Sequence, residues 1–397
     1  MNYSILTQAL PQDVDGVVFD VGSLYLRLLR LTDWRKRRGR RYGLAVILMV
    51  LLLAKLAGQD TAAGIAEWVR LRCGLFVDLF QLKRAQMPHA ATYRRVLGHR
   101  ATLAELEREL SAFLLSAPGA GQSERVTLDG KTLRGVVPLE NGRGTHLLAV
   151  FLPAEGLVLC QVAVDDKSNE IPAAHQALKH LNLQGKIVTA DALHTQRELS
   201  QRVVEAGADY VWIVKDNQPV LRREVELLFE PETCLPGTSP VITDLHTATT
   251  VDKGHGRIET RRLTVSSLLA ESSDWPHLAQ VFQLERQVRR IKTGARYTEV
   301  VYGVTSLPAA RATPQRLLQI VREQWGIENK LHWRRDALLH EDQTRTKSPT
   351  FGQTLAAVNN LVIGLTCRLG WTNLAQARRF FDAHPDEALK ALISRLA

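Results

Sequence analysis

Apolar residues recur at helical spacing through much of the first part of the chain. Helix-like patterns cover 42–57, 62–71 and 102–115, where apolar residues return every three or four positions. The longest apolar run, Leu44 to Ala54, is too short to span a bilayer, which needs about 20 residues. We therefore expect an all-α region up to residue 115 that contains one buried helix.

The pattern changes after a segment rich in Gly, Ser and Ala at 116–123, which we interpret as a linker. Helices are expected at 169–181 and 195–207. Short runs rich in β-branched and apolar residues predict strands at 125–128, 145–152, 157–164, 186–190 and 209–214. Three strands followed by alternating helix and strand is the order expected of an RNase H-like mixed sheet.

The rest of the chain is β-rich from about 217 to 306, and the runs 281–288 and 297–305 flank a short turn as in a hairpin. A long helix is expected to begin at Pro314, and helices follow at 355–369 and 374–381. The predicted fold class is α/β: an RNase H-like mixed sheet with a β-rich insertion, preceded by an all-α domain. The predicted domains are 1–115 and 116–397, with the insertion at about 217–306.

The net charge of the chain bears on its binding partners. The chain has 51 basic and 41 acidic residues, a net charge of +10, which favours a polyanionic partner such as nucleic acid over a merely basic soluble protein. A basic run precedes the first strong helix. It can be a solvated arm, but before a helical domain we expect it to contact backbone phosphates. Its members are Arg35, Lys36, Arg37, Arg38, Arg40 and Arg41.

Cysteine usage and the first residues bear on location. Cys73, Cys160, Cys234 and Cys367 are far apart and form no CxxC pattern, which argues against a zinc site and a disulfide framework. The first residues lack the basic and apolar regions of a signal peptide. We expect a cytoplasmic protein without a membrane partner.

Three carboxylates are candidates for metal chemistry. Asp129 and Asp191 each follow a predicted strand, where the side chain emerges at the sheet edge. Glu328 borders the apolar face of the predicted helix, with Leu331 and His332 beside it. Taken singly, such residues are more often turn residues, helix caps or solvated charges. Together they would form a cradle for Mg²⁺ or Mn²⁺, which prefer carboxylate oxygens. Weaker rivals as ligands are Asp165, Asp166 and Asp336.

Several other residues are placed to meet DNA near these carboxylates. Lys131 and Arg134 follow the first aspartate, and we favour neutralisation of a phosphate over plain surface charge as their role. Lys215 lies at the end of a predicted strand on the same sheet edge, where it could contact a phosphate or be a surface charge. His332 and Trp333 could contact unpaired DNA or belong to the core, and His194 is more simply a residue at a helix start.

Motifs along nearly the whole chain resemble the DDE transposases of bacterial insertion sequences, in particular the ISAs/H-repeat-associated group. An N-terminal segment around Tyr42 and Trp68 resembles the associated domain of that group. The other blocks, in order, are TLDGKTLRG at 127–135, KSNEI at 167–171, IVTADA at 187–192, KDNQP at 215–219, KGHGR at 253–257 with Glu259, and WGIENKLHW at 325–333 with Glu341, Asp342 and Arg345.

The resemblance implies that Asp129, Asp191 and Glu328 form the catalytic and metal-binding triad. It also implies departures from the wider superfamily, because Val321 and Gln324 replace a Tyr and an Arg around the glutamate. Arg335 keeps the cation expected seven residues after Glu328, suited to a phosphate contact. Asp216 replaces a glycine of the group, which changes that turn.

The implied activity is metal-dependent cleavage of transposon ends, followed by attack of the freed 3′-OH on target DNA. The resemblance also implies two metal ions at the site. The expected DNA partners are the terminal inverted repeats and the target, and a homodimer is expected in the synaptic complex. The protein would work beside the bacterial nucleoid. Two alternatives are a catalytically silent DNA-binding or regulatory protein of the same ancestry and a nuclease without strand transfer.

Overall fold

A computed structural model provides the structure. Several residues discussed above lie outside its described part, namely Asp166, Lys167, Ser168, Cys234 and Trp325. The described residues are 22–38, 40–136, 144–165, 169–179, 181–230, 244–324 and 326–394.

Helices precede the sheet, as the apolar spacing predicts. α3 is buried at every position, which explains why its sequence is apolar all round. This confirms the expected buried helix, and no helix in the described part of the chain is long and apolar enough to cross a membrane. The helices are α2 (Leu24–Leu28), α3 (Leu44–Leu56), α4 (Ala62–Leu71), α5 (Cys73–Leu79), α6 (Ala90–Leu97) and α7 (Arg100–Leu115).

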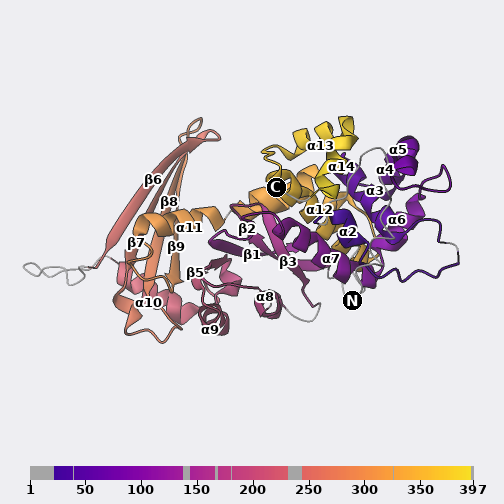
Figure 1. The fold of residues 1–397 in the computed structure, drawn as a ribbon. Coiled ribbons are helices and arrows are strands. Elements are labelled where there is room, and N and C mark those ends of the chain that lie inside the picture. The colour runs from indigo at the N-terminus through magenta and orange to yellow at the C-terminus, as the bar shows by residue number, and fades with distance from the viewer. Residues whose placement is uncertain are drawn as a thin grey trace, which may run out of the picture.

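The last helices of the chain pack against the first ones. α12 (Pro349–Arg368) contacts α3, α6 and α7, while α13 (Leu374–Ala383) and α14 (Pro385–Ile393) also contact α3. A hydrogen bond of 2.7 Å joins Trp68 Nε1 on α4 to Asp382 Oδ1 on α13. Figure 1 shows the helices from both parts of the chain gathered at one end of the molecule. Helices α2 to α7 therefore share a core with the last helices.

A mixed sheet follows these first helices, as expected. The order in the sheet begins β3-β2-β1-β4-β5, with β1, β4 and β5 parallel and β2 and β3 antiparallel to their neighbours. Crossover helices α8 (Glu170–Lys179) and α9 (Arg197–Glu205) connect the parallel strands, since such strands cannot be joined by a tight turn. The strands are β1 (Arg125–Thr132), β2 (His146–Leu152), β3 (Leu157–Ala163), β4 (Ile187–Ala190) and β5 (Asp209–Val214).

The sheet continues into the 217–306 region. After α10 (Pro219–Phe229), four antiparallel strands extend it in the order β9-β8-β7-β6, and β9 pairs directly with β5. The hairpin expected around 281–305 is confirmed by the pairing of β8 with β9. These long strands project away from the helical end (Figure 1). They are β6 (His246–Gly254), β7 (Arg257–Ser266), β8 (Gln280–Arg290) and β9 (Arg296–Thr305).

The helix that begins at Pro314 is shorter in its α form than expected. α11 (Pro314–Gln324) packs Leu317 and Val321 onto Leu263 of β7 and Phe282 of β8. Beyond it the backbone forms the wider π-helical turns η3 (Glu328–His332) and η4 (Arg334–Leu338). Such turns interrupt helices frequently at functional sites. A 3₁₀ turn, η5 (Glu341–Gln343), precedes α12.

Candidate active site

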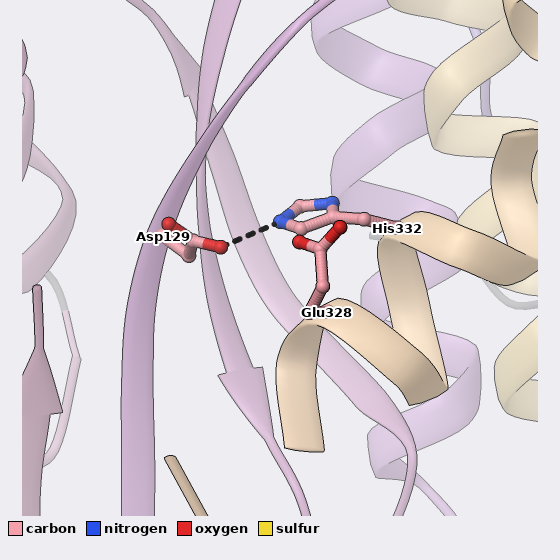
Figure 2. A group of neighbouring side chains, drawn as sticks. All are labelled: Asp129, Glu328 and His332. Carbon is pink, nitrogen blue, oxygen red and sulfur yellow. Dashed lines mark hydrogen bonds and ion pairs between the residues drawn. The ribbon is translucent and has the colours of Figure 1, made fainter. Parts of the chain in front are cut away.

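Two of the three expected carboxylates meet in the structure. Asp129 of β1 and Glu328 of η3 lie together with His332, and one ligand atom from each of the three side chains is within 4.8 Å of the others (Figure 2). His332 Nε2 is 3.0 Å from Asp129 Oδ2. The ring of His332 is buried, whereas Glu328 is exposed, so the cluster opens toward solvent.

This donor set fits a divalent cation. Two carboxylates and an imidazole are ligands that Mn²⁺ and related ions accept, while Mg²⁺ favours the carboxylate oxygens. His332 Nδ1 is buried and has no hydrogen-bond partner in the described part of the chain. The ligands come from two segments far apart in the sequence, so the fold itself brings them together.

Asp129 does not end its strand, contrary to expectation. β1 continues to Thr132 because its antiparallel pairing with β2 extends to His146, whereas its parallel pairing with β4 stops at the Leu128–Ala190 pair. Asp129 therefore projects from β1 where the neighbouring strand has already ended. This position still puts its carboxylate at the sheet edge.

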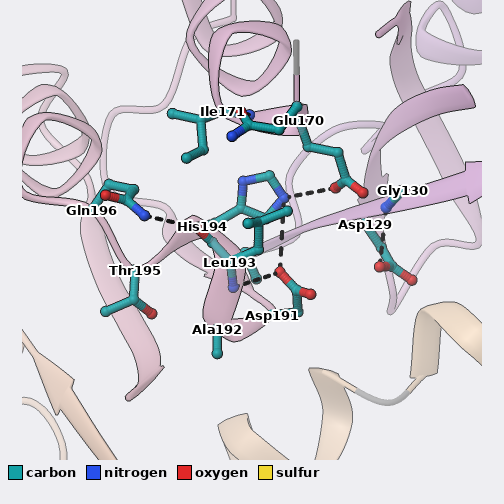
Figure 3. Close-up of polar contacts among 12 residues, drawn as sticks. Asp129, Gly130, Glu170, Ile171, Asp191, Ala192, Leu193, His194, Thr195 and Gln196 are labelled. Atoms are coloured by element: carbon teal, nitrogen blue, oxygen red, sulfur yellow. Dashed lines mark hydrogen bonds and ion pairs between the residues drawn. The ribbon is translucent and has the colours of Figure 1, made fainter. Parts of the chain in front are cut away.

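Asp191 follows β4 directly and is the neighbour of Asp129 across the two strands (Figure 3). It caps the 3₁₀ turn η1 (Ala192–His194), and its Oδ1 accepts a hydrogen bond of 3.1 Å from the Leu193 amide. Burial, opposed by nearby His194, raises the pKa of Asp191, and the negative charges of Glu170 and Asp129 raise it further. Among the described residues Asp191 does not join the 4.8 Å group, so the structure brings it beside the other two without convergence.

Other residues hold the turn that carries Asp191. Asn217 Nδ2 donates to the Ala192 carbonyl at 2.7 Å, and Gln218 Nε2 donates to the Thr195 carbonyl at 2.9 Å. Gln324, which replaces an arginine of the wider superfamily, donates to the Ala190 carbonyl at the end of β4. The KDNQP block and this glutamine thus fix the backbone on both sides of Asp191.

Sequence reasoning missed a polar cluster next to the aspartates. Glu170, the first residue of α8, accepts a bond of 2.7 Å from His146. It also lies 3.0 Å from His194, as Figure 3 shows. Although burial raises the pKa of Glu170, hydrogen bonds from the two histidines hold it at about 2. The available signal was the KSNEI block, which puts a glutamate directly after a strand and a short loop.

The expected DNA-binding cations near the site differ in solvent exposure. Lys131 is buried, with Nζ 2.7 Å from Asp336 and 3.7 Å from Asp342. Arg134 and Lys215 are exposed. Asp336 is therefore the partner of a lysine and is not part of the cluster in Figure 2.

Arg335 is placed differently from the expected phosphate contact. It is fully buried, and its Nε lies 2.9 Å from each carboxylate oxygen of Glu341. Glu341 in turn accepts a bond of 2.9 Å from Asn359 on α12. The widened π-helical turn directs this arginine into the protein, so its cation neutralises an internal glutamate and is not presented to DNA.

The basic run before α3 also contains both paired and unpaired cations. Arg35 and Arg40 both bind Asp33, with nitrogen to oxygen distances of 2.7 and 3.5 Å. The remaining four side chains are exposed and make no hydrogen bond or ion pair among the described residues: Lys36, Arg37, Arg38 and Arg41.

Comparisons with known proteins agree with the motifs. The sequence model of a family described as Transposase DDE domain matches residues 121–362, and one described as DDE_Tnp_1-associated matches 26–114. A transposase candidate of Escherichia coli O157:H7, YncI, is 26% identical over 84% of this chain and 85% of its own. The H-repeat-associated transposase candidate YhhI of Escherichia coli K12 is 28% identical over 60% of this chain and 63% of its own. A piggyBac transposase in a synaptic complex with hairpin DNA aligns with a TM-score of 0.43 and 13% identity, covering 92% of this chain and 78% of that one.

Proposed function

The chain belongs to the transposase DDE-domain family, and from this premise we propose that it cleaves transposon ends and joins the freed 3′-OH to target DNA. The observation that carries the proposal is the meeting of Asp129 with Glu328, beside Asp191. The carboxylates of a strand and a helix meet here, and a third carboxylate follows the neighbouring strand. Such a concentration of charge is costly unless a cation joins it.

We further propose that Asp129, Asp191 and Glu328 hold Mg²⁺ or Mn²⁺, with two ions in the working complex. Bound ions of this kind activate a nucleophile and stabilise the leaving oxygen of a phosphodiester. The raised pKa of Asp191 supports its inclusion, because crowding by Asp129 and Glu170 is part of its cause and a cation would relieve it. Asp191 directly follows β4, which pairs with β1 up to the residue before Asp129, so the two aspartates are neighbours.

The strand order supports an RNase H-like assignment for the catalytic core. Three antiparallel strands precede two parallel ones, and the proposed ligands lie at the same edge. We propose that residues 116–397 form this catalytic domain, with β6–β9 as its insertion at about 217–306. The helices of 1–115 would be the DNA-binding domain, completed by the last helices of the chain.

DNA would meet the protein along exposed cations. Arg134 and Lys215 are exposed and follow β1 and β5, and the unpaired members of the basic run are exposed before α3. Phosphate contacts of this kind position DNA without reading its sequence. We propose two copies of the protein in the synaptic complex, one for each transposon end, working beside the nucleoid in the cytoplasm.

The proposal is tested with DNA duplexes taken from the sequences that flank the gene. Asp129→Asn, Asp191→Asn and Glu328→Gln should each abolish Mg²⁺-dependent cleavage and leave binding of the duplex within about twofold, because each removes a ligand charge without changing shape. Asp336→Asn is the matched control, since its carboxylate pairs with Lys131 outside the group. Full cleavage by a triad variant would remove that residue from the site. Absence of cleavage by the unmodified protein would favour the catalytically silent alternative.

A further inference from the structure

Glu170 joins separate segments around the two aspartates. Its two oxygens are taken by His146 Nε2, from β2, and His194 Nε2, from η1. His146 also shares a hydrogen bond of 2.8 Å with Thr132 at the end of β1. One carboxylate on α8 thus connects the strand beside Asp129 to the turn that begins at Asp191.

The cluster is enclosed and closely fitted to β1. The His194 side chain is fully buried, and that of Glu170 is 17% exposed. Gly130, the residue after Asp129, faces the pair directly: a Cβ at this position would overlap with Glu170 Oε1 and His146 Nε2. A glycine at 130 therefore lets the carboxylate and imidazole pack against the strand that carries Asp129.

The link from this cluster to Asp191 runs through His194. Its Nε2 lies 3.0 Å from Glu170 Oε2 and 3.9 Å from Asp191 Oδ1, so the ring stands between two carboxylates (Figure 3). His194 Nδ1 is buried without a partner in the described part of the chain, so Glu170 is the principal contact that orients the ring. Without Glu170, the His194 ring would lose its shortest polar contact beside Asp191, although Asn217 and Gln218 would still hold the turn.

We propose that Glu170 is a positioning residue of the metal centre, which fixes the spacing of Asp129 and Asp191 through His146 and His194. This inference rests on the proposed function, because the spacing matters only if a cation binds between the aspartates. Partners that orient metal ligands without touching the ion commonly change metal affinity or activity about 10–100-fold when they are removed. Glu170 belongs to the KSNEI block, which would then contribute to the metal centre through this residue.

A second carboxylate bridge in the same sheet provides a matched control. Glu155, in the turn between β2 and β3, accepts bonds of 2.8 Å from the Gly121 and Ser123 amides and 3.0 Å from Arg368. Its side chain is 15% exposed, close to the 17% of Glu170. Loss of either bridge should lower stability, but only Glu170 is beside the aspartates.

The test uses the full chain with Glu170→Gln or Glu155→Gln. Mn²⁺ is titrated without DNA and followed by the rise in melting temperature that binding produces. The Mn²⁺ dependence of cleavage and the affinity for end DNA are measured in parallel. We expect Glu170→Gln to raise the half-saturating Mn²⁺ concentration roughly 10–100-fold in both titrations, with DNA affinity unchanged. Glu155→Gln should lower the melting temperature and leave half-saturation within about twofold.

The inference is overturned if Glu170→Gln only lowers the melting temperature, as Glu155→Gln does. If that variant does not fold, His146→Ala serves in its place, because it removes one of the two bonds and leaves His194 attached. An unchanged half-saturating Mn²⁺ concentration in His146→Ala would equally overturn the inference. If the unmodified protein binds Mn²⁺ and cleaves DNA while these variants match it, the proposed function stands and only the role of Glu170 fails. If the unmodified protein neither binds Mn²⁺ nor cleaves DNA, the proposed function and the role of Glu170 are both wrong.

Discussion

Glu107 of α7 is an acidic residue whose environment opposes its charge. It lines a small cavity with Cys160 and Asn360, and its Oε1 is buried without a partner in the described part of the chain. Burial raises the pKa of Glu107 to about 7, and hydrogen bonds from Gln161 only partly oppose this. The folded protein therefore keeps this carboxyl protonated at a pH where an unfolded chain would not.

This arrangement makes stability depend on pH. The folded state binds more protons than the unfolded state between the ordinary pKa of 4.5 and about 7, so the contribution of Glu107 is fully present below pH 4.5 and is lost as pH rises through 7. The difference between the two pKa values corresponds to about 3 kcal/mol. Glu107→Gln should remove this loss and raise the melting temperature at pH 8 relative to the unmodified protein. Identical melting curves for both proteins from pH 5 to 8 would contradict the assignment.

At the residue scale, sequence patterns located the candidate carboxylates better than they located their contacts. The places of Asp129 after a strand and of Glu328 beside an apolar helix face, together with the motif resemblance, predict a shared site, and the structure brings the two side chains together. The motif resemblance also singled out Arg335, but spacing cannot reveal that a π-helical turn points this side chain at Glu341. The bridge made by Glu170 was not foreseen either, since it depends on His146 and His194 meeting one carboxylate from different elements.

At the scale of elements, the four strands β6–β9 differ along their length. Their inner part is structural, because Leu263 and Phe282 cover the apolar face of α11, so removing the strands would uncover the helix that leads to Glu328. In the middle, the buried Glu259 binds Arg257, Arg261 and Arg286. The outer end carries a group of exposed cations without a side-chain partner among the described residues, including Arg289, Arg290, Lys292 and Arg296.

We expect this outer end to hold the cleaved DNA for the joining step. Replacing Arg289, Arg290, Lys292 and Arg296 with Gln should reduce joining of labelled ends to a target plasmid roughly 10–100-fold, because a misplaced 3′-OH loses its alignment. First-strand nicking should persist. The control variant, Arg222→Gln with Arg223→Gln, removes two cations of α10 that already pair with Asp216, Glu226 and Glu230, and it should join normally. Normal joining by the outer-end variant would favour the nuclease alternative.

Elements were predicted more reliably than their connections. Strand β5 and helix α4 have the bounds that the apolar pattern indicated, because each has a clear periodicity between turn residues. The pairing of β9 with β5 makes the strands of 217–306 a continuation of one sheet. This pairing is long-range, so the local pattern of residues does not reveal it. The packing of α12 on α7 is equally long-range.

At the scale of the whole molecule, the net charge of +10 should appear in the salt dependence of DNA binding. Replacing Lys36, Arg37, Arg38 and Arg41 with Ala should weaken binding of cognate and random duplexes alike. It should also flatten the slope of log K against log salt by roughly 0.9 for each phosphate that the variant no longer neutralises.

The paired members of the same run provide the control. Arg35→Ala with Arg40→Ala removes side chains that already bind Asp33, so it should alter the local fold more than the slope. A slope unchanged in the four-residue variant would mean that the run is only a solvated surface. Fluorescence anisotropy at several salt concentrations measures both variants.

The wholly apolar helix α3 also has a consequence for synthesis on the ribosome. It is made well before α12, α13 and α14, which cover part of it. At about 5–20 residues per second, the interval between Leu56 and Pro349 is roughly 15–60 s. Throughout that time a nascent chain presents a strongly hydrophobic helix with part of its final covering absent. Such a chain is a natural client for a chaperone that shields apolar segments until translation ends.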